Sequence, residues 1–302
     1  MKKPPYIRKD DTIGIIAPAG IVDPKDIEPA IDILREWGLN VAKGKYLYHK
    51  HNFFAGSDKQ RLEDFQAMLD DRSIKAIFCA RGGYGLIRIL NELDFTHFRK
   101  NPKWIVGYSD ITLIHSFLSK KLKIQSLHAI MPKNFIRALE DNQSLDFLKK
   151  ALFGEPLSYE IPFQKLSREG NAKGMLTGGN LSILCSLQAT PYEIETKNKI
   201  LFIEDVNEYL YRLDRMMINM KMSNKLSGLK GLIIGGMTDM KNTAPDYGKN
   251  AYEIVYEMVK EYNYPVLFGF PAGHMYPNLP LIMGNEVEMN VKQETCSIKF
   301  LP

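Results

Sequence analysis

Residues Ile74–Gly85 read IKAIFCARGGYG, an apolar run followed directly by a turn that contains three glycines. Residues Trp104–Asp110, WIVGYSD, repeat the pattern of an apolar run and a tight turn. Both runs are typical of buried strands, and the first turn leads into a helical pattern at Leu86–Leu90. In an open parallel sheet such turns lie together at the carboxyl ends of the strands, where ligands bind. The two stretches therefore predict a doubly wound α/β sheet with a site at this edge.

Helix signals separate the apolar runs of the first half. Asp23 is a common N-cap residue, and Pro24 after it favours the first position of a helix. Ser57, with Gln60 three residues later, forms the pattern of a capping box. We therefore predict that residues 1–152 form an N-terminal domain with a flavodoxin-like or Rossmann-like parallel sheet.

The second half has a different pattern. Periodicity lapses at residues 153–171, which we interpret as the connection between domains. Beyond it, residues 172–302 combine apolar runs such as Lys199–Glu204 with helical patterns and short alternating strands such as Glu286–Val291. This composition predicts a smaller mixed α+β domain, with the active site between the two domains.

Composition excludes several function classes. The chain has 302 residues and a net charge of +5, from 40 basic and 35 acidic residues spread along its length, which argues against a nucleic-acid partner. No apolar segment follows the basic N-terminus and no 18-residue apolar run occurs, so we expect a cytoplasmic protein without a membrane partner. Cys79, Cys185 and Cys296 are far apart among apolar neighbours, which favours reduced, buried thiols over disulfides or a zinc site.

Ser109 is the first candidate for chemistry. In a turn from strand to helix, its hydroxyl would project from the strand end while the N–H of Asp110 points at the same place, giving a nucleophile and half of an oxyanion hole. The alternative is that Ser109 only caps the helix. A nucleophile elbow requires glycine where Ile111 stands, so an α/β-hydrolase proper is disfavoured.

The glycine turn Arg81–Gly85 is the second candidate. Its N–H groups could bind a phosphate, a carboxylate or a developing oxyanion, or the turn could simply be tight. It matches neither the dinucleotide nor the P-loop fingerprint, so no nucleotide cofactor is indicated.

Glu204 and His274 complete the candidates. Glu204 ends an apolar strand, where a carboxylate without a partner would be costly, so we expect it to face a cleft or a cation. His274 lies in an irregular loop, Pro271–Asn278, that could present its imidazole to a cleft. Because neither H-x-x-E nor H-E-x-x-H spacing occurs to support a metal, His274 is better interpreted as a general base than as a ligand.

Together these motifs resemble the serine LD-carboxypeptidases, the family that includes muramoyl-tetrapeptide carboxypeptidase and the microcin C immunity peptidase. The resemblance extends over nearly the whole chain. The motifs that carry it are, in order, Ile13–Pro18, Arg81–Gly85, Gly107–Asp110, Gly178–Leu181, Glu204–Asp205, Asp214–Arg215 and Gly273–His274.

The resemblance implies a Ser-His-Glu triad that spans two domains. Ser109 would be the nucleophile, His274 the general base and Glu204 the residue that orients the imidazole. The N–H groups of Asp110 and Gly83 would form the oxyanion hole. Tyr84, Gly179 and Asn180 are the corresponding candidates for substrate binding. The resemblance also implies a homodimer, and no cofactor or metal.

The family's usual substrate is a murein tetrapeptide, from which the terminal D-alanine is released in the cytoplasm during wall recycling. Departures from the family pattern bear on the shape of the substrate cleft and leave the triad matched: Asn207 stands where glycine is common, and His128–Met131 replaces a His-Gly-Pro-Met-like stretch. Two alternatives stay open. The same fold could hydrolyse peptidyl- or aminoacyl-nucleotides, or the chain could be a small-molecule binding protein in which Ser109 only caps a helix.

Overall fold

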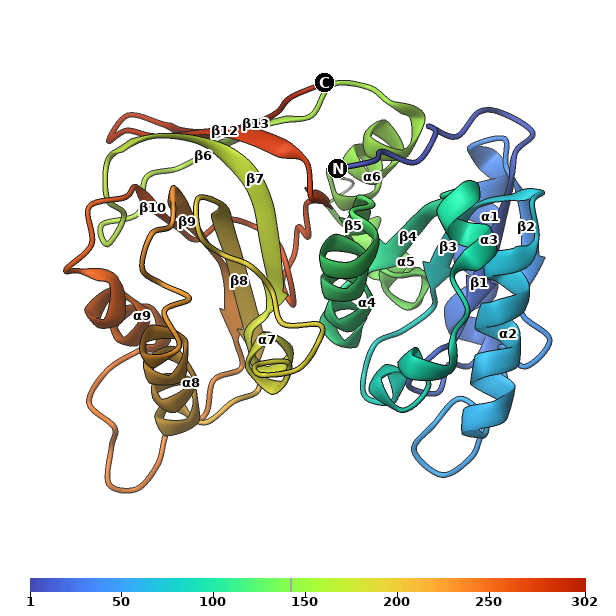
Figure 1. Ribbon diagram of the computed structural model, residues 1–302, viewed down its shortest axis with the longest axis horizontal. Helices are drawn as coiled ribbons and strands as arrows, with labels where there is room; N and C mark the ends of the chain where they lie inside the picture. The colour runs from blue at the N-terminus through green and yellow to red at the C-terminus, as the bar shows by residue number, and fades with distance from the viewer. Residues whose placement is uncertain (142) are drawn as a thin grey trace.

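The computed structural model describes residues 1–141 and 143–302. The chain forms two lobes, each built on its own sheet, with the helix α4 (Thr112–Phe117) between them (Figure 1). Among the described residues, no helix is long and apolar enough to cross a membrane.

Five parallel strands and one antiparallel strand form the first sheet, in the order β11-β5-β4-β3-β1-β2. Its strands are β1 (Thr12–Ile16), β2 (Asn40–Lys43), β3 (Ile74–Cys79), β4 (Trp104–Gly107), β5 (Ser126–His128) and β11 (Leu281–Met283). The order 2-1-3-4-5 of its parallel strands is the flavodoxin-like one, so the predicted doubly wound sheet is confirmed. Its α-helices, besides α4, are α1 (Pro24–Glu36), α2 (Asp58–Asp70), α3 (Thr96–Lys100), α5 (Phe135–Ala138) and α6 (Gln143–Phe153).

Local sequence signals explain how two of these helices begin. The capping box of Ser57 and Gln60 is present at α2, with both reciprocal hydrogen bonds. Asp23 is the N-cap of α1, but its carboxylate makes no capping hydrogen bond and instead accepts one from Lys50 Nζ at 2.5 Å. Pro24 at the first position of α1 needs no N–H partner.

The sequence predicted a helix at Leu86–Leu90, and this prediction is wrong. The chain makes two single 3-10 turns there, separated at Ile89, whose φ of −114° is far from the value of about −63° in a regular α-helix. The single 3-10 turns are Leu86–Arg88, Leu90–Glu92, Ser109–Ile111 and Pro132–Asn134, and Leu118–Leu122 is a π turn.

The second sheet is mixed, in the order β10-β9-β8-β7-β12-β13-β6. Its strands are β6 (Ser158–Ile161), β7 (Gly170–Asn180), β8 (Ile200–Val206), β9 (Gly231–Thr238), β10 (Val266–Phe268), β12 (Glu286–Val291) and β13 (Cys296–Phe300). Its helices are α7 (Leu181–Ser186), α8 (Leu210–Met222) and α9 (Ala251–Val259). The long strand β7 makes the sheet mixed, since its first half pairs antiparallel with β12 and its second half parallel with β8.

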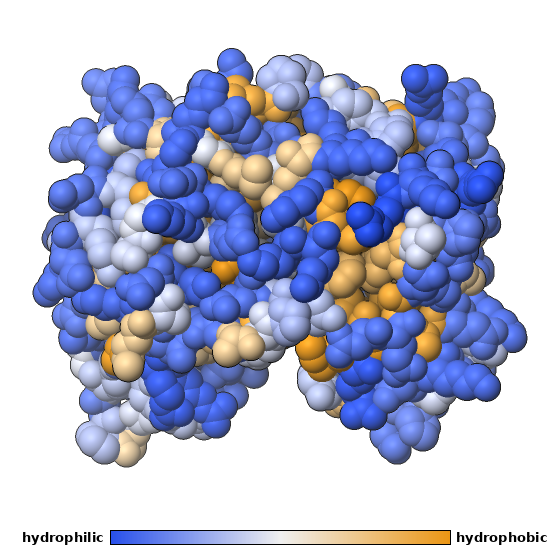
Figure 2. All heavy atoms as spheres, viewed as in Figure 1, coloured by the Kyte–Doolittle hydropathy of each residue, from blue (hydrophilic) through white to orange (hydrophobic). Residues whose placement is uncertain are grey.

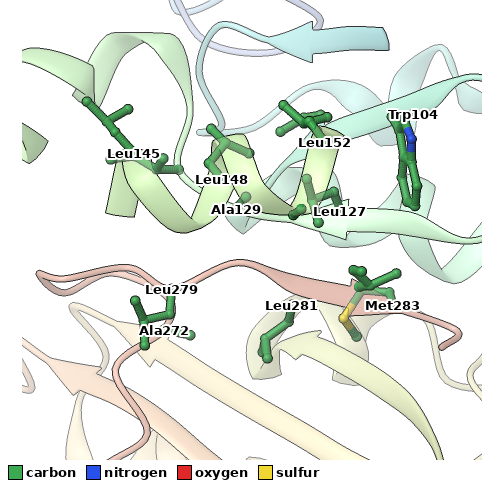
Figure 3. Packing of buried hydrophobic residues seen from close by; sticks show 14 of the residues in the cluster. Trp104, Leu127, Ala129, Leu145, Leu148, Leu152, Ala272, Leu279, Leu281 and Met283 are labelled. Atoms are coloured by element: carbon green, nitrogen blue, oxygen red, sulfur yellow. The ribbon is translucent and has the colours of Figure 1, made fainter. Parts of the chain in front are cut away.

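Two segments differ from the expected division of the chain. The stretch 153–171 contains β6, whose alternating residues pair with β13, and the first residues of β7. Strand β11, from the second half, lies at the edge of the first sheet, where Leu281 pairs with His128. Its residues belong to the same hydrophobic cluster as residues of β5 and α6, so one hydrophobic core continues from lobe to lobe (Figure 3). The two sheets therefore form one interlocked unit.

Candidate active site

Ser109 lies directly after β4 in a strained turn. Its backbone has φ of +64°, in the left-handed region that residues other than glycine rarely adopt. Ser109 is itself the first residue of the 3-10 turn Ser109–Ile111, and neither the N-cap of this turn nor that of α4 makes a side-chain capping hydrogen bond. Capping therefore does not account for this serine, and strain of this kind is common at functional sites.

The glycine turn packs directly on Ser109. A Cβ atom added to Gly82 would lie 2.8 Å from Ser109 Cβ, 3.0 Å from its Oγ and 3.4 Å from the backbone nitrogen of Asp110. Only glycine lets the two turns approach so closely. Gly82 thus packs against Ser109, a contact that sequence reasoning did not single out, while the expected donor Gly83 is the next residue, with φ of +105°.

The side chain of Asp110 links the Ser109 turn to the end of the glycine turn by a hydrogen bond. Its carboxylate is buried, and Oδ2 accepts a hydrogen bond from the N–H of Leu86 at 3.0 Å. Burial raises the pKa of this carboxyl to about 6, against the opposing effects of backbone N–H groups and Arg61. On the other side of the glycine turn, the buried guanidinium of Arg61 donates to the carbonyl of Gly85 at 2.9 Å. The backbone that would bind an oxyanion is therefore held rigidly.

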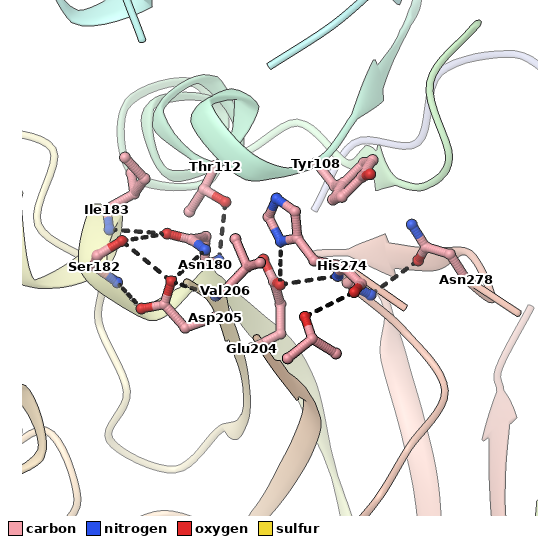
Figure 4. A network of polar contacts seen from close by, with 12 residues as sticks. Tyr108, Thr112, Asn180, Ser182, Ile183, Glu204, Asp205, Val206, His274 and Asn278 are labelled. Atoms are coloured by element: carbon pink, nitrogen blue, oxygen red, sulfur yellow. Dashed lines mark hydrogen bonds and ion pairs between the residues drawn. The ribbon is translucent and has the colours of Figure 1, made fainter. Parts of the chain in front are cut away.

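Glu204 and His274 form a close pair from the second sheet (Figure 4). Glu204, two residues before the end of β8, is fully buried, and its Oε2 lies 2.7 Å from His274 Nδ1 and accepts the backbone N–H of His274 at 3.2 Å. Burial alone would lower the pKa of His274, but the hydrogen bond and charge of Glu204 raise it overall. With Nδ1 held by the carboxylate, Nε2 is the nitrogen that can accept a proton.

Small residues make room for this pair. A Cβ atom on Gly273, whose φ is +101°, would lie 2.5 Å from Glu204 Oε2. The N–H of Gly273 donates to Asn278 Oδ1 at 2.9 Å, and Thr238 Oγ1 donates to the carbonyl of His274 at 2.8 Å. Asn278 lies in the loop that the sequence singled out, but nothing in its spacing indicated that it would fix the loop.

Tyr108 brings the two halves of the site together. The ring of Tyr108, the residue before Ser109, lies 4.8 Å from the ring of His274, edge to face. On its other side Tyr108 lies 6.0 Å from the ring of His128, which is buried and whose pKa burial holds well below its usual value. The expected nucleophile and the expected base therefore come from neighbouring positions across the junction of the lobes. Figure 2 shows the molecule hollowed between the lobes along its lower edge.

Gly179 and Asn180 have packing roles. A Cβ on Gly179 would lie 2.6 Å from Thr112 Oγ1, and the N–H of Asn180 donates to the same oxygen at 3.0 Å. The Asn180 side chain caps α7 through the N–H of Ile183 and donates to Asp205 Oδ1 at 3.0 Å. These contacts tie α4 to the second sheet. Substrate binding by Gly179 and Asn180 stays a prediction.

Tyr84, the other residue expected to bind substrate, is exposed rather than buried. It lies on the glycine turn with 48% of its surface exposed, and its ring centroid lies 5.9 Å from that of Phe54. An exposed aromatic ring next to the two turns is available for a ligand.

The remaining polar candidates have structural explanations. His115 is buried and its ring nitrogens lie 2.8 Å from Ser126 Oγ and the carbonyl of Gly107, so it supports the end of β4. All three cysteines are free; Cys79 and Cys296 are buried as expected, whereas Cys185 is only partly buried. Within residues 1–141 and 143–302, no group of three or more His, Cys, Asp or Glu residues could hold a metal ion.

The fold is that of a two-lobed α/β protein with a candidate serine-hydrolase site, and comparison with known proteins identifies the family. The LD-carboxypeptidase N-terminal domain matches residues 13–129, and the LD-carboxypeptidase C-terminal domain matches residues 173–289. The chain therefore belongs to the LD-carboxypeptidase family, which confirms the resemblance noted in the sequence.

Individual relatives support the same family assignment. The chain is 37% identical to a Bacillus subtilis protein named "Probable murein peptide carboxypeptidase", over 98% of this chain and 94% of that protein. It is 25% identical to the Escherichia coli microcin C7 self-immunity protein MccF, over 95% and 93% of the two chains. The crystal structure of muramoyltetrapeptide carboxypeptidase from Oxalobacter formigenes superimposes with a TM-score of 0.88 at 27% identity, covering 96% of this chain and 99% of that one.

Proposed function

We propose that this LD-carboxypeptidase removes the terminal D-alanine from murein tetrapeptides, using Ser109, His274 and Glu204 as its triad. The observation that carries the proposal is the buried Glu204–His274 pair, 2.7 Å long, beside the strained turn of Ser109. The names of the relatives from Bacillus subtilis and Oxalobacter formigenes support murein peptides as the substrate class.

The chemistry is acyl transfer through an ester of Ser109. As Ser109 Oγ attacks the scissile carbonyl carbon, its proton passes to His274 Nε2, and the backbone N–H groups of Asp110 and Gly83 stabilise the oxyanion. Collapse of the tetrahedral intermediate breaks the C–N bond, and His274 returns the proton to the departing amine of D-alanine. A water molecule, deprotonated by the same base, then hydrolyses the ester and regenerates Ser109. Throughout, Glu204 holds the imidazole in the useful tautomer.

Mass spectrometry of a murein tetrapeptide incubated with the purified protein tests the proposal. We expect the wild type to release one alanine with a chelator present throughout, and Ser109→Ala to leave the peptide intact. An intact tetrapeptide with the wild type would contradict the proposed substrate.

A second candidate is hydrolysis of peptidyl- or aminoacyl-nucleotides. The exposed ring of Tyr84 beside the glycine turn favours it, because a nucleotide base could stack there. Cleavage of an aminoacyl sulfamoyl adenosine in the same assay, with no cleavage of the tetrapeptide, would select this candidate. If Ser109→Ala kept full affinity for a ligand that neither protein cleaves, the chain would instead be a binding protein.

The family resemblance also supports a cytoplasmic homodimer. Light scattering of the purified protein should give twice the chain mass of 34.6 kDa, and cell fractionation should recover it with soluble cytosolic enzymes. A monomer in solution, or recovery with the membranes, would contradict these two expectations.

A further inference from the structure

A second site lies at the opposite edge of the first sheet. A cavity of about 330 Å³ opens beside the N-terminal segment, which crosses this edge before entering β1 (Figure 1). Its lining includes Ile74, the first residue of β3, and Lys103, which directly precedes β4. The cavity thus lies at the amino ends of the same strands whose carboxyl ends carry the candidate active site.

The cavity is lined by positive charge. No aspartate or glutamate occurs among the described residues that line it. Its cationic residues, which we call the lysine pocket, are Lys2, Lys3, Arg72, Lys75, Lys100 and Lys103. None of the ion pairs found between side chains of the described chain includes a residue of the lysine pocket. Six cations therefore share one cavity, and within the described residues no carboxylate forms an ion pair with any of them, which concentrates positive potential there.

Lys103 is the buried member of this group. Its ammonium donates to the backbone carbonyls of Met68 at 2.9 Å and Asp71 at 2.5 Å, at the end of α2. Burial lowers the pKa of Lys103 to about 8, despite the opposing charge of Asp71. An ammonium has three N–H donors, so one remains for a ligand. A buried cation without a paired anion is costly, and binding of an anion would reduce that cost.

The nearest acidic side chains are engaged elsewhere. The carboxylate of Asp71 accepts hydrogen bonds from the backbone N–H and the hydroxyl of Ser73, at 2.8 and 2.7 Å. Asp70 Oδ2 accepts from Gln66 Nε2 at 2.9 Å. Neither carboxylate forms an ion pair with a cation of the pocket in the described chain.

One wall of the cavity is aromatic. Tyr6 is 39% exposed and stacks on the buried Trp104, with 6.3 Å between their ring centroids. Trp104 Nε1 donates to the carbonyl of Pro5 at 3.0 Å, which fixes this wall to the sheet. The cavity therefore combines an ordered flat surface with several ammonium groups, and its volume is at the small end of the range for ligand sites.

We propose that the lysine pocket binds a compact anion that carries two or more phosphate groups. Several ammonium groups and one guanidinium around a small cavity suit a multiply charged phosphate better than a single carboxylate, because each phosphate accepts several charge-assisted hydrogen bonds. The site is separate from the chemistry proposed for Ser109, so its test does not depend on that function.

Calorimetric titration with tripolyphosphate tests this site on the full chain. The double variant Lys75→Gln/Lys100→Gln removes two exposed charges of the pocket, and Lys165→Gln/Lys292→Gln removes two exposed charges outside it. We expect the wild type to bind one tripolyphosphate, the pocket variant to bind at least about tenfold more weakly, and the control to stay within about twofold of the wild type. Each pair lowers the net charge equally, so non-specific attraction would weaken both alike.

A second probe distinguishes a soluble phosphate from a lipid headgroup. Vesicles that contain cardiolipin, whose headgroup carries two phosphates, are offered to the same three proteins in a sedimentation assay. Tripolyphosphate binding that the pocket variant loses identifies a soluble ligand, and vesicle binding lost in the same way identifies a headgroup. Equal losses in both variants, or no binding of either probe to the wild type, would overturn the proposal.

Discussion

Ser109 and His274 lie at neighbouring positions but are held there by different interactions. On the Ser109 side the backbone does the positioning, with a left-handed residue at φ of +64° packed against Gly82. On the His274 side the position depends on a pair of side chains, the buried Glu204 and the imidazole. The first half should therefore depend mainly on backbone conformation, supported by the buried Asp110 and Arg61 side chains, whereas the second should be sensitive to charge and to any added atom.

The largest effect should come from removing the nucleophile. We expect Ser109→Gly and Ser109→Ala each to lower kcat by about 10⁴-fold or more, as for other acyl-transfer triads. Since glycine tolerates a positive φ, the glycine variant should unfold with a free energy about 1 kcal/mol higher than the alanine variant. Urea denaturation measures the difference. If the alanine variant were equally stable, the backbone of this turn would not be strained.

Changing the charge of the pair should have the next largest effect. Glu204→Gln keeps the shape but removes the carboxylate, and we expect kcat to fall by about 10³ to 10⁴-fold. The pKa of His274 is raised by Glu204, and the base must be neutral, so activity of the wild type should rise as pH rises through that pKa. In the variant this acidic limb should move to lower pH. A limb that stayed in place in the pH profile of kcat/KM would mean that Glu204 does not act on His274.

The Glu204–His274 pair should also make the free energy of unfolding depend on pH. Because the folded pKa of His274 is raised, its pairing with Glu204 stabilises the wild type fully below the unfolded pKa, and this contribution is lost as pH rises through the folded pKa. In Glu204→Gln the free energy of unfolding should lack this pH-dependent contribution from His274.

Added volume at the pair should destabilise the fold itself. Gly273→Ala meets both a positive φ and a clash with Glu204 Oε2, and we expect a loss of about 4 kcal/mol in the free energy of unfolding. Gly248→Ala is the matched control, because Gly248 has φ of +81° but nothing within 4 Å of the added Cβ. It should lose only about 1 kcal/mol. Equal losses in thermal denaturation would show that crowding at Glu204 is unimportant.

The smallest effect should come from Asp110, on the backbone side. Its pKa is raised to about 6, so the folded protein holds a proton there that the unfolded chain releases near pH 4. This contribution to stability is present at low pH and is lost as pH rises from about 4 through about 6. Asp110→Asn should therefore become more stable relative to the wild type over that window, by up to about 3 kcal/mol. Its catalytic N–H is retained, so kcat should change little.

Denaturation of both proteins at several pH values checks this difference. The raised pKa of Asp205 acts in the same window but is common to both and cancels. A stability difference that did not vary with pH would show that Asp110 is ionised at all of them.

The parts of the fold that follow from local signals could be predicted. Pro24 and the Ser57–Gln60 capping box placed two helices, and alternating apolar residues placed β12 and β13. The helix expected at Leu86–Leu90 failed because its backbone follows the neighbouring glycine turn. Strand β11 could not be placed in the first sheet, since three apolar residues say nothing about which distant strand they will meet.

For the candidate site, the sequence by itself determined which residues are available: a serine after a strand, a carboxylate where an apolar strand ends, and a histidine in an open loop. These are local patterns, and the chemistry of each side chain is the same wherever it lies. Only the tertiary structure decided that Glu204 meets His274, that Tyr108 joins His274 to the Ser109 turn, and that six cations surround one cavity. Each of these contacts joins residues far apart in the chain, and such contacts arise only when both sheets and their shared core form.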